Sequence, residues 1–217
     1  MTEEAKLFIE ELKARPDVLG IILFGSWARG DNRPDSDVDL VVILREGYRR
    51  TVEHKNGEVF EIIFTTEDGA LDYWDSHKDD AFGLWEVAKI LYDQNGTVLR
   101  LQDKIKTLLD SGKCPIDEYQ IGQYRFDAKD QLKVSGVLAQ SDTTAANFIL
   151  TNKVFALTEL FFDLRKEWTP APKQRLAKIR EIKPELYTEL ENFYQDGALL
   201  GDKLKIAEQI INFVFEI

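Results

Sequence analysis

Cysteine is nearly absent from this chain of 217 residues, which contains only Cys114. A single cysteine cannot form an internal disulfide, so a disulfide-framed domain is excluded and a reducing compartment is favoured. Histidine is almost as rare, and His54 and His77 lack the partner spacing of a zinc site or a nucleophilic triad. With 44% hydrophobic and 31% charged residues, the composition is that of a globular protein with an ordinary apolar core.

The chain also lacks an apolar run of about 18 residues, the length at which a membrane-spanning helix is considered. Residues 2–6, Thr-Glu-Glu-Ala-Lys, do not have the charged-then-apolar layout of a signal peptide. We therefore expect a cytoplasmic protein without a membrane partner. The length suits one large domain or two small ones, each able to bury a core.

Positive charge is in deficit, because 28 Lys and Arg residues stand against 39 Asp and Glu residues, for a net charge of −11. Nucleic acids are held mainly by basic side chains that neutralise phosphates, so this balance disfavours a nucleic-acid partner. An acidic surface is better suited to a cationic small molecule. Solubility alone explains the same charge in most acidic proteins, and that interpretation stays open.

The most informative feature that is present is a tight turn after an apolar strand. Residues 18–24 are mostly apolar and partly β-branched, which predicts a buried strand that ends at Gly25. Gly25 permits backbone angles closed to other residues and a close approach of phosphate to the main chain. Ser26 is predicted to be the N-cap of a helical turn that Gly30 ends, and its hydroxyl would bind an anion together with the free N–H groups.

A second strand is predicted over residues 37–44, Asp-Val-Asp-Leu-Val-Val-Ile-Leu. Side chains alternate between the faces of a strand, so Asp37 and Asp39 share one side, roughly 7 Å apart along it. They can converge on one metal ion or bracket a pair, and Mg²⁺ suits such oxygen ligands because it also binds substrate phosphates. Ser36, just before this strand, either helps to hold a phosphate or caps the strand.

A third carboxylate comes from the strand predicted at residues 58–65, which follows the hairpin signal Asn56-Gly57. Glu61 interrupts its apolar stretch, which is costly unless the carboxylate is paired or binds a metal. Glu61 is therefore a candidate metal ligand, or a general base for an acceptor hydroxyl. The competing interpretation is an edge-strand charge that discourages aggregation, and Glu58 is the alternative carboxylate.

These residues resemble the Gly-Ser…Asp-x-Asp pattern of the DNA polymerase β-like nucleotidyltransferases. The pattern is carried by Gly25-Ser26, Gly30 and Ser36-Asp37-Val38-Asp39-Leu40. The resemblance implies a small mixed sheet flanked by helices, with Asp37 and Asp39 as metal ligands and the triphosphate near Ser26. It also implies a third carboxylate on a nearby strand, which we assign to Glu61.

The layout of the whole chain is similar to that of the aminoglycoside and lincosamide nucleotidyltransferases. Residues 88–93, followed by Asn95-Gly96, resemble the stretch that leaves the catalytic domain in those enzymes. In that group a lysine of the helical half can reach the nucleotide phosphates, and Lys173 is the candidate here. The resemblance implies Mg²⁺-dependent transfer of AMP from ATP to a hydroxyl of a small acceptor, with release of pyrophosphate, and a homodimer is compatible with it.

Two other functions stay open. One is a protein AMP- or UMP-transferase of the antitoxin type, although such proteins often work beside a separate helical partner, whereas here the helical half is fused. The other is an inactive nucleotide-binding module. Degenerate modules usually lose a carboxylate, and this chain keeps Asp37 and Asp39 in register and adds Glu61.

The remaining patterns predict an α+β protein. Residues 3–15 form an amphipathic helix that Pro16 ends, residues 49–53 form a short strand, and residues 98–109 form a helix. Residues 111–115, Ser-Gly-Lys-Cys-Pro, predict a break in regular structure. After this break, helices are predicted at 116–139, 143–167, 173–181, 184–195 and 199–216. We expect a catalytic domain with a small mixed sheet at residues 1–112. An all-α bundle at residues 113–217 would supply acceptor specificity.

Residues 67–86 are rich in both acids and aromatics, including Tyr73, Trp74 and Trp85. One interpretation is an aromatic and acidic wall for an amino-sugar, held by ion pairs and cation–π contacts. The other is a solvated helix face whose aromatic side chains pack on the sheet.

Overall fold

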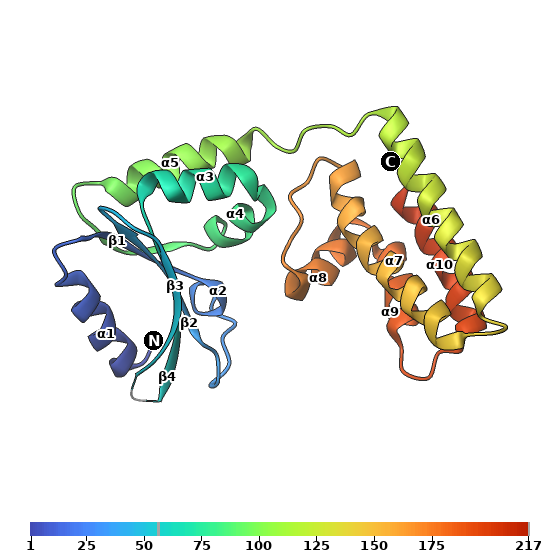
Figure 1. The fold of residues 1–217 in the computed structure, drawn as a ribbon, viewed down its shortest axis with the longest axis horizontal. Helices are drawn as coiled ribbons and strands as arrows, with labels where there is room; N and C mark the ends of the chain where they lie inside the picture. Colours follow the sequence, from blue (N-terminus) through green and yellow to red (C-terminus); the bar gives the residue numbers. More distant parts are fainter. Residues whose placement is uncertain (56, 217) are drawn as a thin grey trace. The chain divides into compact units, whose positions relative to one another are not determined.

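The computed structural model describes residues 1–55 and 57–216, so Asn56 of the predicted hairpin turn lies outside the described residues. The chain divides into two compact units, Met1–Ser111 and Gly112–Ile217, called here the sheet unit and the helical unit (Figure 1). No helix of the described residues is both long and apolar enough to cross a membrane.

Within the described residues, the sheet unit is built on a mixed sheet of five strands in the order β3-β4-β2-β1-β5. β2 runs parallel to β4, and the other neighbouring pairs are antiparallel. The strands are β1 (Val18–Phe24), β2 (Val38–Leu44), β3 (Arg49–Lys55), β4 (Glu58–Thr65) and β5 (Lys89–Asp93). Because β2 and β4 are parallel, their first residues lie at the same edge of the sheet.

The four strands predicted from the sequence are all present, and β1 and β4 have the predicted bounds. β2 begins one residue later than predicted, at Val38, and β3 continues to Lys55. The sequence analysis did not predict β5. Each residue of β5 is at least partly exposed, so it shows no alternation of buried and exposed positions. It is held as a strand by its antiparallel pairing with β1.

Helices cover both faces of the sheet (Figure 1). On one face, α1 (Glu3–Lys13) packs against alternate residues of β2, including Val38 and Leu40. The other face is covered by α3 (Glu67–Ser76), α4 (Lys78–Trp85) and α5 (Thr97–Asp110). Val41 of β2 packs in this second layer, so Asp39 belongs to the face that α3, α4 and α5 cover.

The aromatic side chains of residues 67–86 contribute to this second layer. Trp74 and Trp85 are buried and meet edge to face, with ring centroids 5.0 Å apart. Tyr73 is exposed instead. The packing interpretation of the segment is therefore confirmed for its two tryptophans.

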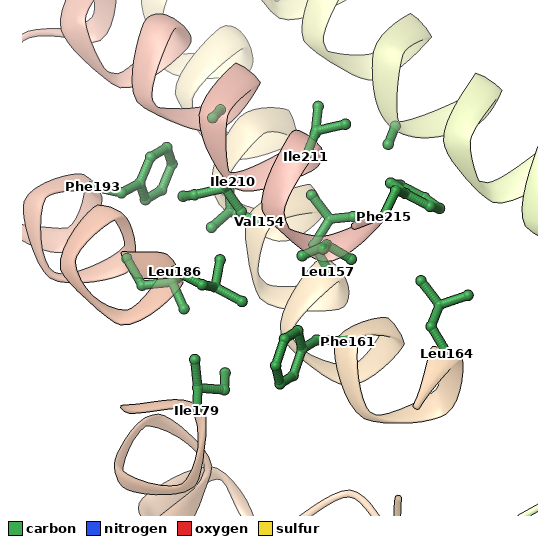
Figure 2. Close-up of a cluster of buried hydrophobic side chains, with 14 of the residues drawn as sticks. Val154, Leu157, Phe161, Leu164, Ile179, Leu186, Phe193, Ile210, Ile211 and Phe215 are labelled. Carbon is green, nitrogen blue, oxygen red and sulfur yellow. The ribbon is translucent and has the colours of Figure 1, made fainter. Parts of the chain in front are cut away.

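Among the described residues, the helical unit has five helices and no strand. They are α6 (Glu118–Leu138), α7 (Thr143–Leu164), α8 (Pro172–Ile182), α9 (Pro184–Tyr194) and α10 (Leu200–Val214). The predicted helices agree with these bounds to within three residues at each end. Figure 2 shows the core they enclose, in which Phe161, Phe193 and Ile210 are completely buried. The α+β fold class, with a helical second half, is confirmed.

Candidate active site

Three carboxylates of the sheet unit converge near the first residues of β2 and β4. One oxygen atom each from Asp37, Asp39 and Glu61 lie within 4.8 Å of one another. Asp39 and Glu61 are directly opposite in the parallel β2–β4 pair, and Asp37 is the residue before β2. We call these three residues the carboxylate cluster. The structure thus brings together all three predicted acidic residues, and the pairing of β2 with β4 places the third.

The donor set of the carboxylate cluster fits a hard divalent cation. Asp37 is exposed, whereas Asp39 and Glu61 are half-buried, so the cluster is open to a ligand on one side. Three negative charges at this separation repel one another unless a cation neutralises them. Mg²⁺ takes oxygen ligands, often one or two carboxylates together with substrate phosphates. The cluster can therefore hold a divalent cation and share it with a phosphate-bearing ligand.

Gly25 follows β1, and only a glycine fits at this position because Asp39 lies directly against it. Its φ of +66° is in the left-handed region, which favours glycine. A Cβ atom at this position would lie 1.8 Å from Oδ2 of Asp39, so the carboxylate rests against the glycine backbone. The sequence predicted a glycine that lets phosphate approach the main chain. The structure adds a second reason, because any side chain here would displace a member of the carboxylate cluster.

The predicted N-cap role of Ser26 is wrong. The short helix α2 (Gly25–Arg29) begins one residue earlier, with extended Phe24 in the N-cap position and no side-chain cap. The left-handed conformation of Gly25 starts the turn, so Ser26 is its second residue. The predicted end of the turn is confirmed, because Gly30 is left-handed with φ +88° and its N–H donates to the Ser26 carbonyl at 2.8 Å.

Ser36 and Trp27 connect α2 to the segment that carries Asp37. The indole Nε1 of Trp27 donates to the Ser36 carbonyl oxygen at 3.2 Å. The Ser36 hydroxyl accepts the backbone N–H of Arg33 at 2.8 Å, which closes the loop before β2. Trp27 was not predicted as a site residue, and it positions the backbone immediately before the first carboxylate.

Arg50 of β3 is the main site residue that the sequence analysis missed. Its Nε donates to Oε1 of Glu61 at 2.9 Å, and its Nη2 forms a second, short contact with the same oxygen. The hydrogen bond and the charge of Glu61 raise the pKa of Arg50 above its ordinary value. A signal was available in the hairpin register, which pairs Lys55 with Glu58 and Val52 with Glu61. Arg50 is two residues from Val52 and so lies on the same face as Glu61.

Tyr73 of α3 is close enough to Arg50 for the positive charge of Arg50 to act on its hydroxyl, and it lies on the face that holds the carboxylate cluster. Although Tyr73 is largely exposed, partial desolvation of its hydroxyl, followed by the nearby charge of Asp80, raises the pKa of Tyr73 above its ordinary value. Its hydroxyl donates to Oδ2 of Asp80 at 3.2 Å. Tyr73 therefore stays protonated at neutral pH and acts as a hydrogen-bond donor, not as a base.

Lys173, the predicted phosphate ligand, is in the helical unit, exposed in the first turn of α8. The helical unit also has a groove of about 590 Å³ between α8 and α9. It is lined by Leu176, Tyr187, Leu190, Glu191, Asn192, Tyr194 and Gln195. Its mixture of aromatic rings, amides and one carboxylate is suited to a polar small molecule.

Comparison with known proteins agrees with this geometry. Residues 5–107 match a protein family described as "Nucleotidyltransferase domain", and this range contains the sheet and the carboxylate cluster. The chain is also similar to the crystal structure of a nucleotidyltransferase-like protein from Exiguobacterium sibiricum 255-15. The sequence identity is 15%, the TM-score is 0.51, and the match covers 99% of this chain and 74% of that one. No curated protein matches the chain.

Proposed function

We propose that this enzyme transfers AMP from ATP to a hydroxyl of a small cationic acceptor, since residues 5–107 match the nucleotidyltransferase domain family. Pyrophosphate is the second product. Nucleotidyl transfer itself follows from the family. One observation supports a metal-dependent transfer, namely the carboxylate cluster with its oxygens within 4.8 Å of one another.

Asp37, Asp39 and Glu61 would hold Mg²⁺, as two ions, which when bound neutralise the triphosphate and the charge that develops during transfer. Gly25 and Ser26 would lie along the triphosphate, because their backbone adjoins Asp39. Lys173 would contact the phosphates from the helical unit. Both Arg50 contacts end on Oε1 of Glu61, which favours a fixed ligand role for Glu61 over a mobile general base.

The reaction that these residues would promote is an in-line displacement. The acceptor oxygen forms a bond to the α-phosphorus, and the bond from that phosphorus to the oxygen bridging to the β-phosphate breaks. Pyrophosphate leaves with the bridging oxygen, and the hydroxyl proton passes to a carboxylate or to water. Positioning and charge stabilisation account for most catalysis in such transfers, which fits a site made of carboxylates on rigid strands.

The acceptor is proposed to be cationic, of the aminoglycoside or lincosamide kind. The net charge of −11 favours a positively charged ligand over a nucleic acid. In the helical unit, the groove between α8 and α9 carries Tyr194 and Glu191, which can bind an amine by cation–π contact and ion pairing. Glu191→Gln should therefore raise the KM for a cationic acceptor and leave the KM for ATP unchanged.

The test is pyrophosphate release from ATP with Mg²⁺, measured with and without a pooled set of aminoglycosides and lincosamides. We expect release that depends on the pool and stops when EDTA removes the metal. Label from α-³²P-ATP that appears in protein instead would support the alternative, a protein AMP-transferase. No release with any pool member, and no labelled protein, would reject the proposed acceptor class.

Asp39→Asn tests the site itself. We expect its turnover to fall by at least about a hundredfold, because the variant keeps the shape of Asp39 but loses its charge. Asp35→Asn is the matched control, since Asp35 is an exposed acid of the loop just before β2 and pairs with Arg33 outside the cluster. Equal activity of the Asp39→Asn variant and the wild type would contradict the assignment of the site.

A further inference from the structure

Helix α6 is unusual among the helices of the helical unit because so little of it is buried. Of its 21 residues, only Ala128 and Ser135 are fully buried. Ile121 and Leu132 are partly buried against the core on the same side. Through this inward face α6 packs on α7 and α10, as Figure 1 shows. The inward face alone therefore accounts for the packing of α6 in the bundle.

Apolar residues also occupy the opposite face of α6. Tyr119 is 75% exposed, Phe126 is 70% exposed and Val137 is 66% exposed. At about 100° per residue, these three lie roughly 160–180° around the helix from Ala128. A solvated helix face is normally polar, and this one has large apolar side chains at both ends of its length. We call this surface the outer face of α6.

Two opposite charges lie between the apolar residues of the outer face. The positions Phe126, Asp130, Lys133 and Val137 are four, three and four residues apart, which aligns them along one side of the helix. Asp130 and Lys133 are both exposed, and neither has an ion-pair partner among the described residues. The outer face is therefore apolar, negative, positive and apolar in that order.

We propose that the outer face of α6 binds the outer face of α6 in a second copy of this chain, with the two helices antiparallel. The two-fold axis of this dimer passes midway between Phe126 and Val137 along the helix. It therefore places Phe126 of one copy opposite Val137 of the other. The same axis sets Asp130 against Lys133, because the members of each pair are equally far from it. Each contact then occurs twice, as an isologous interface requires.

The order of charges favours a second copy over other occupants. A lipid surface would have to take both Asp130 and Lys133 out of water, which is costly even if the two charges pair with each other. A partner surface of a single charge sign would repel one of the two. The contact is one helix about 31 Å long, so we expect a dimer with a Kd on the order of micromolar.

The experiment is sedimentation velocity of the full chain over a concentration series. We expect a reversible monomer–dimer equilibrium in the wild type. Phe126→Asp should raise the Kd at least about tenfold, because it places a charge at an apolar contact. Phe148→Asp is the matched control: Phe148 of α7 is also a phenylalanine, 68% exposed, but it is not on the outer face. Its Kd should equal that of the wild type.

Charge reversal tests the register. Asp130→Lys alone and Lys133→Asp alone each create two like-charge contacts across the axis, so each should weaken the dimer. The double variant restores opposite charges and should return the Kd to near the wild-type value. All positions are exposed, and circular dichroism verifies that each variant is folded. A wild type that stays monomeric, a Phe126→Asp dimer of unchanged affinity, or a double variant that does not recover would each overturn the proposal.

Discussion

The sheet unit and the helical unit differ in how far they neutralise charges that lie close together, although Arg50 does pair with Glu61 in the sheet unit. In the helical unit, buried Arg175 donates to Glu159 at 3.0 Å and to the Thr158 hydroxyl at 3.2 Å. In the sheet unit, three residues of the same charge lie within 4.8 Å of one another. The first arrangement satisfies a charge that burial would otherwise penalise. The second costs stability, and such clusters mark the place where a protein binds a ligand.

The largest expected difference between the units concerns their cores. Phe161→Ala removes a completely buried ring from the helical core and should lower its unfolding free energy by about 3–5 kcal/mol. Hydrogen exchange by mass spectrometry, read peptide by peptide, should show faster exchange in residues 112–216 and unchanged exchange in the sheet. Phe148→Ala, at a 68% exposed position, should change little. Equal loss of protection in the sheet would show that the two units unfold together.

Gly25→Ala should have the next largest effect, and it should fall on the sheet unit. The left-handed backbone costs about 1–3 kcal/mol for a residue with a side chain, and the new Cβ must also displace Asp39. We expect Mn²⁺ binding, measured by electron paramagnetic resonance, to weaken together with the melting temperature.

Gly30→Ala separates these two causes. Gly30 is also left-handed, but nothing lies within 4 Å of its Cβ position. This variant should lower stability by about 1 kcal/mol and leave Mn²⁺ affinity unchanged. If both variants bind Mn²⁺ as the wild type does, the contact between Gly25 and Asp39 has no role in holding the site.

Asp39→Asn sharpens the comparison because its effects on stability and activity should have opposite signs. Removing one of three like charges should raise the unfolding free energy by up to about 1 kcal/mol while turnover is lost. Urea unfolding without metal measures this change. A clear loss of stability would mean that the contacts of Asp39 outweigh the repulsion among the three carboxylates.

The smallest effect is a pH dependence in the helical unit. The hydrogen bond from Lys183 to Glu216, followed by its charge, lowers the pKa of the Glu216 carboxyl below the ordinary value of 4.5. Its stabilising contribution is therefore complete above pH 4.5 and is lost as the pH falls through the lowered pKa. Thermal melts from pH 6 down to pH 3 should show a slightly shallower decline for Glu216→Gln. Identical profiles would mean that the exposed pair contributes nothing measurable.

Much of the candidate site could be predicted because alternation along a strand is a local property. Asp37 and Asp39 stand out as charges in an apolar strand, and Glu61 stands out in the same way. The ends of the helices in the helical unit were predictable to within three residues for a similar reason. The spacing of apolar residues and the residues that end a helix are both local features of the sequence. The chemistry of the cluster, oxygen ligands for a divalent cation, also follows from residue type alone.

The contacts that complete the site join residues distant in sequence, and only the tertiary structure decided them. The parallel pairing of β2 with β4 sets Glu61 opposite Asp39, and the register of β3 brings Arg50 to Glu61. Asp39 lies against the backbone of Gly25, and α2 begins at this glycine, one residue before Ser26. Local propensity carries no information about strand order or register. These depend on which surfaces bury each other best once the whole sheet has formed.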